Sequence, residues 1–383
     1  MKKFLVFLGL VLLIVVVVLV LRGGCGGDTS NGSLEFVKNE SDGNYSVNRV
    51  KSADVTEVEI PATYRNKPVT SIRGYAFKGC TSLTKVTIPD SVKSIGDSAF
   101  ANCSALSSVT FGNGVIEIYS AFYGCTSLTS ITLPNSVKRI GSEAFYGCTG
   151  LTSVVFGNGI ERIDDFAFCR CSSLTSITIP DGVTSIGNAT FAGCTGLTSI
   201  TIPDGVTSIG NGAFENCSSL TSITIPNGVT SIEQSTLARC TGLTSVTIPD
   251  GVTSIGNSAF IGCSGLTSII IPDSVESIGD NAFYNCTGLT SVTIGNGVEG
   301  MRRSAFEKCT GLTSITIPSN LYIIQPNVFN GCSSLTSVTF SNTTGWYVSL
   351  LGDESGSAMT VTDPVQNAKN LVSDYSSVYW IQK

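Results

Sequence analysis

Cysteine is the residue type whose spacing in this chain first suggests chemistry. Twelve of the 14 cysteines recur every 23 residues, with a single step of 22. Thiols in register could form a disulfide ladder or bind a soft metal ion. Neighbouring strands, however, hold their Cβ atoms about 4.8 Å apart, whereas a disulfide needs about 3.8 Å. One cysteine per repeat also lacks the paired spacing of a zinc site. We therefore expect free thiols packed as small buried groups. The twelve are Cys80, Cys103, Cys125, Cys148, Cys171, Cys194, Cys217, Cys240, Cys263, Cys286, Cys309 and Cys332.

One further cysteine lies outside this register. Cys169 stands two residues before Cys171 and has no counterpart in the other repeats. We expect it to be the thiol that is exposed or paired.

Other catalytic and metal-binding groups are also missing from the sequence. The chain contains no histidine, which excludes His-based general bases, catalytic triads and His-ligated metals. Aspartates at one turn position could form a calcium ladder, but asparagine takes the same position in other repeats, as an Asx turn requires. We expect no catalytic residue, no metal and no cofactor. The aspartates are Asp181, Asp204, Asp250 and Asp273, and the asparagines are Asn113, Asn135, Asn158, Asn227 and Asn296.

The charge of the chain argues against nucleic acid as a partner. Only 13% of the residues are charged and the formal net charge is −6. The Lys and Arg residues are scattered singly, whereas a nucleic-acid-binding protein needs a clustered basic face.

The repeat predicts the elements that hold these residues. In the unit 194–216, Leu197-x-x-Ile200-x-Ile202 alternates apolar and polar residues as a half-buried strand does. Pro203-Asp-Gly then predicts a turn. The pair Val206-x-x-Ile209 returns apolar side chains to the interior, and the stretch up to Cys217 predicts a short helical or 3₁₀ turn.

Repeats of this length predict a solenoid, in which each coil buries its apolar face by stacking on its neighbours. Thirteen segments fit the strand pattern, from 55–60 to 335–340. We expect about 13 stacked coils of 23 residues, one continuous parallel β-sheet, and short helical or 3₁₀ turns on the opposite side. A column of twelve aromatic positions, Phe in all but Leu237, predicts the core. The step of 22, where a residue is missing between Ile118 and Ala121, predicts a tighter turn.

Both ends depart from the repeat. Residues 1–25 combine Lys2 and Lys3 with an apolar run over 4–21, which predicts a signal peptide or an N-terminal membrane anchor with the repeats outside the cytoplasm. Cys25, in a Gly-rich stretch, is a candidate for lipidation. Lipid attachment, an uncleaved anchor and full secretion all remain open at this point.

The remaining boundaries follow from where the period starts and stops. We expect a tether and N-terminal cap over 26–54, the solenoid over 55–340 and a C-terminal cap over 341–383. In the last of these, Asp363-Pro364 predicts the start of a helix that runs to about Ser373.

The unit Cys-x-x-Leu-x-x-Ile-x-Ile-Pro-x-x-Val-x-x-Ile-x-x-x-Ala-Phe-x-x resembles the consensus of the BspA-like leucine-rich repeats of bacterial and protist surface proteins. Residues 60–72 resemble the opening coil of that family, and the resemblance covers about 55–340. It implies a leucine-rich-repeat solenoid, tethered to the outer face of the membrane or envelope, that binds extracellular protein or glycan partners in adhesion. It implies no catalytic residues. A structural spacer without a ligand is the alternative, while ice binding and enzymatic activity are weaker ones.

Two sets of surface residues are candidate binding sites. The first is the outward Thr that follows the central aliphatic residue of most strands, which would give a flat, uncharged hydroxyl surface or merely satisfy strand propensity. The second consists of large or charged side chains where repeats differ, since aromatics and Arg are common interface anchors. The first set is Thr110, Thr132, Thr178, Thr201, Thr224, Thr247, Thr293 and Thr316, interrupted by Val155 and Ile270; the second is Tyr123, Tyr146, Tyr284, Arg302 and Arg303, with Arg139, Arg162, Arg170 and Arg239 as further variable positions.

Overall fold

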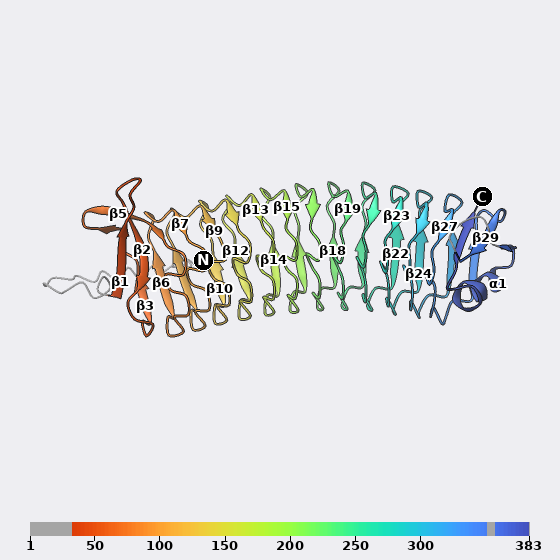
Figure 1. The fold of residues 1–383 in the computed structure, drawn as a ribbon, viewed down its shortest axis with the longest axis horizontal. Coiled ribbons are helices and arrows are strands. Elements are labelled where there is room, and N and C mark those ends of the chain that lie inside the picture. The colour runs from red at the N-terminus through yellow and green to blue at the C-terminus, as the bar shows by residue number, and fades with distance from the viewer. Residues whose placement is uncertain (1–32, 351–356, 383) are drawn as a thin grey trace, which may run out of the picture.

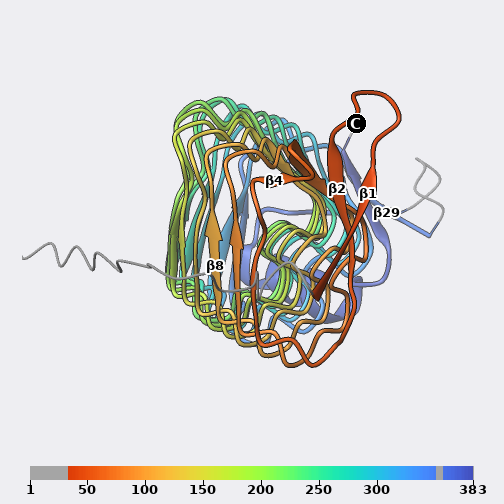
Figure 2. The same cartoon turned by 90° about the vertical axis from the view of Figure 1, so that its left-hand side faces the viewer.

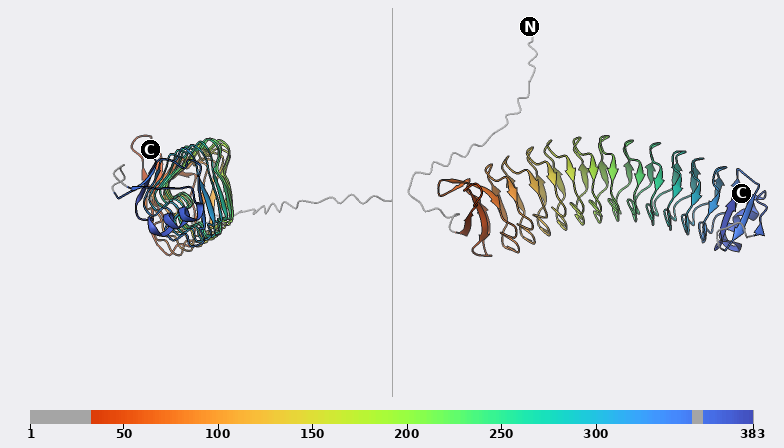
Figure 3. Two further views of the ribbon diagram at one scale, coloured as in Figure 1. Left: turned by 90° about the vertical axis from the view of Figure 1, so that its right-hand side faces the viewer. Right: turned by 45° about the horizontal axis from the view of Figure 1, so that its top comes forward.

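The alternation of apolar and polar residues in each repeat produces one coil of a long, gently curved stack (Figure 1, Figure 3). A computed structural model describes residues 33–350 and 357–382; the apolar run over 4–21 and Cys25 lie outside these ranges. The predicted solenoid of about 13 coils is confirmed.

The thirteen predicted strands are all present, each three or four residues long. They are β3 (Glu57–Glu59), β6 (Lys85–Ile88), β8 (Ser108–Phe111), β10 (Ser130–Thr132), β12 (Ser153–Val155), β14 (Ser176–Thr178), β16 (Ser199–Thr201), β18 (Ser222–Thr224), β20 (Ser245–Thr247), β22 (Ser268–Ile271), β24 (Ser291–Ile294), β26 (Ser314–Ile317) and β28 (Ser337–Phe340).

These strands do not form the one continuous sheet that we predicted. They form one parallel three-stranded ladder, β3-β6-β8, and five parallel pairs from β10-β12 to β26-β28. Proline follows most of the strands and has no N–H to extend a ladder. Where Gly112, Gly295 or Ser341 replaces it, the N–H donates to the preceding coil and the ladder reaches four residues. Successive ladders remain stacked but are joined by longer bonds, such as the 3.4 Å from Thr221 N to Thr198 O.

The largest sheets lie on another side of the coil, where the sequence indicated only a return to the interior (Figure 2). The Ile of each Val-x-x-Ile pair belongs to a two-residue parallel strand. These strands are β7 (Ser94–Ile95), β9 (Glu117–Ile118), β11 (Arg139–Ile140), β13 (Arg162–Ile163), β15 (Ser185–Ile186), β17 (Ser208–Ile209), β19 (Ser231–Ile232), β21 (Ser254–Ile255), β23 (Ser277–Ile278), β25 (Gly300–Met301) and β27 (Ile323–Ile324).

The stretch before each cysteine is a run of turns rather than the predicted helical or 3₁₀ turn. In one coil, the N–H groups of Ala213, Glu215 and Cys217 each donate to the carbonyl three residues earlier. The alternate residues Gly212 and Asn216 have positive φ, 59° in both. Because of this alternation the remaining N–H groups point along the stack. Those of Gly212 and Asn216 donate to the next coil at 2.8 and 2.7 Å.

The core consists of the columns that the repeat predicts. Neighbouring Phe rings stack in parallel, with centroids 4.8–5.8 Å apart. The 22-residue coil keeps this register: its shortened turn contains Ser120 at φ 36°, and Phe122 remains in the stack. Leu237 leaves the one gap, so that the stack ends at Phe214 and resumes at Phe260.

The second sheet is interrupted at the same coil. Its strands run without a break from β1 to β17 and again from β19 to β30, but β17 does not pair with β19. Neither Thr230 N–H nor Glu233 N–H donates to the preceding coil, whereas the equivalent Thr253 and Gly256 do so at 2.9 and 2.7 Å.

The ends of the stack are covered by additional elements. The strands β1 (Leu34–Lys38), β2 (Tyr45–Val50), β4 (Thr63–Tyr64) and β5 (Lys67–Ile72) extend the second sheet at one end, where Phe36 stacks on Tyr64 at 4.2 Å. At the other end lie β29 (Trp346–Ser349), β30 (Ser357–Ala358), α1 (Pro364–Lys369), the π-helical turn η2 (Asn370–Asp374) and β31 (Tyr379–Gln382). Asp363 caps α1 as predicted, accepting from the N–H groups of Val365 and Gln366.

Candidate functional surfaces

The cysteine column is structural in a way that the sequence only partly indicated. All 13 cysteines in the described part are free and buried, as predicted for the column. Each thiol of the 23-residue column from Cys103 onward donates to the carbonyl oxygen of the core residue in the preceding coil, at 3.1–3.2 Å. Burial raises the pKa of these thiols, to about 12 for Cys103 and Cys148. They are therefore S–H donors rather than nucleophiles.

The prediction for Cys169 was wrong. Its side chain is buried and unpaired, although at 7% it is the most exposed of the described cysteines. Burial raises the pKa of the Cys169 thiol as well.

Three of the turn aspartates and asparagines bind the backbone of the next coil. Asp90, Asn135 and Asp273 each accept from the N–H of the Asn one repeat later, at 2.7–2.9 Å. In all three cases the later coil begins its turn with Gly instead of Pro. Within 33–350 and 357–382, no group of three or more His, Cys, Asp or Glu is placed to hold a metal ion.

The predicted Thr column forms an exposed strip along the first set of strands. All eight candidate threonines point outward, beside exposed serines two residues earlier. Their hydroxyl groups make no hydrogen bond to the described residues. Only Val155 and Ile270, 57% and 68% exposed, place large apolar side chains in this column. We call these eight threonines and their neighbouring serines the hydroxyl face.

A second Thr recurs once per repeat, but its hydroxyl group is hydrogen-bonded in most coils. The Thr that directly follows the core Leu, such as Thr198 or Thr290, donates its hydroxyl to a carbonyl of the preceding coil at 3.0 Å. Threonine hydroxyls are thus divided into a column that ties coils together and a column that is available to a partner.

The variable anchors form separate clusters. Tyr123 and Tyr146 stack at 4.9 Å, and the Arg170 guanidinium lies 5.7 Å from the Tyr146 ring centroid. Burial raises the pKa of Tyr146. Six repeats further on, Tyr284 contacts Lys308, whose Nζ is 2.5 Å from the phenol oxygen.

Two further anchors, Arg302 and Arg303, are exposed and lie outside both clusters. The backbone N–H of Arg303 donates to Asp280 and Gln325. The structure therefore does not unite the five anchor residues into one site.

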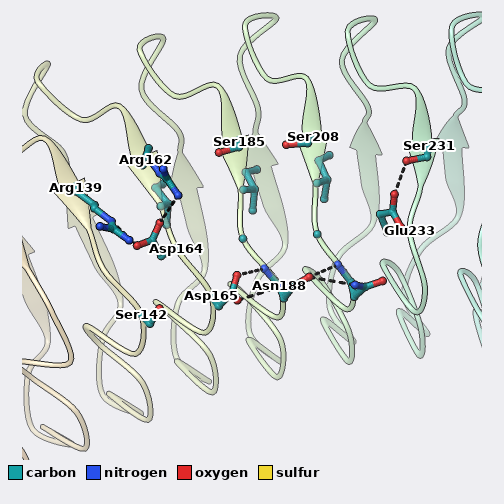
Figure 4. Close-up of a pocket in the computed structure, with 16 residues that line it drawn as sticks. Arg139, Ser142, Arg162, Asp164, Asp165, Ser185, Asn188, Ser208, Ser231 and Glu233 are labelled. Carbon is teal, nitrogen blue, oxygen red and sulfur yellow. Dashed lines mark hydrogen bonds and ion pairs between the residues drawn. The ribbon is translucent and has the colours of Figure 1, made fainter.

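A hollow of about 490 Å³ crosses β11 to β19 on the second sheet, and we call it the polar trough (Figure 4). At one end, Asp164 accepts from Arg139 Nε at 2.5 Å and from Arg162 at 3.5 Å. Arg139 also donates to Tyr119 Oη at 3.0 Å, and its hydrogen bond to Asp164 raises the pKa of the guanidinium. At the other end, Glu233 accepts from Ser231.

The sequence indicated only part of this trough. Arg139 and Arg162 were recognised as variable positions, but Asp164 and Glu233 were missed. The available signal was a break in a column in which glycine is the commonest residue, as at Gly187 and Gly210.

No helix within the described ranges is long and apolar enough to cross a membrane.

Comparisons with known proteins agree with this architecture. The family model for the BspA type leucine rich repeat region matches residues 50–173, 118–244, 161–272 and 253–349. A solved leucine-rich repeat protein from Bacteroides ovatus is 29% identical, with a TM-score of 0.59 over 80% of this chain and 86% of that one. A leucine rich cell surface protein from Faecalibacterium prausnitzii is 28% identical, with a TM-score of 0.53 over 84% and 96%. The comparison with curated proteins found no match.

Proposed function

This chain belongs to the family of BspA-type leucine-rich repeat proteins, and from that premise we propose that it is a non-enzymatic cell-surface protein. In this proposal it binds an extracellular protein or glycan through the hydroxyl face. Membership of this family suggests that the chain interacts with other proteins. One similar solved structure is described as a cell surface protein.

The observation that carries the proposal is the division of the threonine hydroxyls. The Thr that directly follows the core Leu, such as Thr198, already uses its hydroxyl group in a hydrogen bond between coils. The threonines of the hydroxyl face, including Thr201 and Thr224, are exposed and their hydroxyl groups are free. Strand propensity alone accounts for Thr at these positions, but a ligand would also use the free hydroxyl groups as donors and acceptors.

The stack would act by summing weak contacts. Each coil offers one Ser and one Thr at a fixed spacing, and the strands that present them are held by the coil core. A rigid surface loses little conformational entropy on binding, so modest contacts from several coils add to a useful affinity.

Attachment to the cell is the second half of the proposal. The apolar run over 4–21 and Cys25 support either an N-terminal anchor or a lipid-modified cysteine, and both would hold the stack on the outer surface. Mass spectrometry of the membrane-extracted protein tests this, because a diacylglycerol-modified chain that begins at Cys25 differs in mass from one that retains 1–24.

Adhesion of cells that carry the full chain tests the binding surface. We expect Thr201→Glu, Thr224→Glu and Thr247→Glu together to reduce adhesion to extracellular-matrix proteins or to a glycan array, because three charges would need desolvation at the interface. The control places the same charges beside the second sheet, at Thr184, Thr207 and Thr253. Because Thr207 and Thr253 lose a hydrogen bond to the preceding coil there, circular dichroism first checks that both variants are folded. Equal adhesion of both triple variants, with a loss only when whole coils are deleted, would favour the spacer alternative.

A further inference from the structure

The polar trough lies where several successive coils depart from the pattern of the repeat. The first residue of the short strand is Ser in β7 and in the five strands from β15 to β23, but Glu117, Arg139 and Arg162 occupy it in three successive coils. Two positions further along each coil glycine is the commonest residue, and Asp164 and Glu233 replace it. Between these two walls lie two coils that carry only Ser and Gly at both positions, which leaves the hollow between them (Figure 4).

One wall holds a fixed guanidinium and an available one. The Asp164 side chain is only 9% exposed and binds Arg139 at 2.5 Å, which leaves Arg139 34% exposed. Arg162 is 61% exposed and reaches the same carboxylate only at 3.5 Å. Because an Arg side chain has five N–H donors, Arg162 keeps most of them for a ligand in the trough.

The opposite wall contains unpaired backbone groups. Ile209 and Glu233 both line the trough, and the N–H of Glu233 would pair with the C=O of Ile209 if β17 and β19 were joined as the other strands are. Neither group has a hydrogen bond to the described part of the chain. Backbone groups without a partner in the protein need water or a ligand, so this gap offers a donor and an acceptor beside the Glu233 carboxylate.

The chemistry of the lining selects the class of ligand. Each carboxylate has a partner already: Asp164 has the arginines, Asp165 has Asn188, and Glu233 has Ser231. The trough therefore does not require a ligand of either charge. The isoleucines that line it, Ile163, Ile186 and Ile209, are buried, so most of the surface it exposes is polar. Hydroxyl, amide, guanidinium and backbone groups remain, which suit a ligand with many hydroxyl groups.

We propose that the polar trough binds a short neutral oligosaccharide, with Arg162 donating to sugar hydroxyls at one end and Glu233 accepting from them at the other. The volume of about 490 Å³ lies within the usual range of small-molecule sites, roughly 300–1,000 Å³. This site lies on a different sheet from the hydroxyl face and does not depend on the function proposed for that face.

The test uses the full chain on an array of neutral and acidic oligosaccharides of two to six sugars, followed by calorimetry with the best neutral binder. Arg162→Ser and Glu233→Gly restore the residues of neighbouring coils, so the stack should be preserved. We expect each to weaken binding at least tenfold. The control Glu299→Thr makes a similar replacement by the common residue of its column, outside the trough, and should leave the affinity unchanged.

Three results would overturn the proposal. These are the absence of any neutral binder, binding restricted to acidic sugars, and undiminished binding by the combined Arg162→Ser and Glu233→Gly variant. The triple Glu variant of Thr201, Thr224 and Thr247 separates the two sites, because it should abolish binding by the hydroxyl face and leave the trough unaffected.

Discussion

The gap in the Phe stack predicts that Leu237→Phe stabilises the protein. Leu237 is fully buried between Phe214 and Phe260, and it contributes no ring to a stack that is otherwise continuous. The substitution would restore two ring pairs. Stacked aromatic pairs contribute about 0.5–1.5 kcal/mol each beyond the area that they bury, so the gain would be about 1–3 kcal/mol.

Strain is the opposing effect, because a larger side chain in a packed core commonly costs about 1–3 kcal/mol. The backbone argues that the strain is small here. Leu237 N donates to the next coil at 2.9 Å, within the 2.7–3.0 Å found where Phe occupies this column. Thr236 also fits beside a ring, since the equivalent Thr190 precedes a stacked Phe191. We therefore expect a net gain of about 1–2 kcal/mol.

Urea unfolding followed by circular dichroism measures this change. The reciprocal variant Phe283→Leu opens a gap inside an intact stack and should lower stability by a similar amount. If Leu237→Phe leaves the midpoint unchanged or lowers it while the native spectrum is preserved, the coil has already collapsed around Leu237 and the reasoning from column spacing fails.

Three further predictions rest on other features. The amides of Thr230 and Glu233 should exchange with deuterium faster than their equivalents in the next coil, because neither is hydrogen-bonded; equal protection would contradict the break in the second sheet. Stability should be complete below about pH 9 and should fall as the pH rises toward about 12, because burial raises the pKa of thiols such as Cys103 to about 12 while an unfolded thiol ionises near 8.5–9. Each thiol contributes about 1.4 kcal/mol per pH unit to that slope, and a slope in urea–pH titrations that Cys103→Ala does not reduce would refute this. Gly262→Ala should cost about 1–2 kcal/mol in thermal unfolding because φ is +70° there, whereas Gly205→Ala, which has room for a methyl group and no positive φ, should be nearly neutral.

The features predicted successfully are those that one repeat encodes by itself. The strand from Leu197 to Ile202 follows from alternation within six residues, and the Phe column follows from the fixed period. The second sheet was not predicted because a strand of two residues, such as β17, is too short to show an alternating pattern. The division of the first sheet depends on which strands precede Pro and how neighbouring coils pair.

The sites were less predictable because they depend on contacts between coils. Thr198 and Thr201 have the same side chain, and only the stacked structure shows that one hydroxyl is used and the other is free. Asp164 and Glu233 are 69 positions apart in the sequence, and the period alone does not reveal the hollow between them. Cys169 lies outside the register of the cysteine column, but that position did not make it exposed.

Because the thiols become protected only when the coils are stacked, folding and exposure to an oxidising exterior must occur in a particular order. Disulfide exchange needs a thiolate, so the assembled stack, with its protonated and inaccessible sulfurs, would resist oxidants. The unstacked chain has no such protection, because its thiols ionise normally and could link repeats that are not neighbours. If the chain is exported as proposed, its coils must assemble before oxidation, and each added coil would shield the sulfur of the one before it.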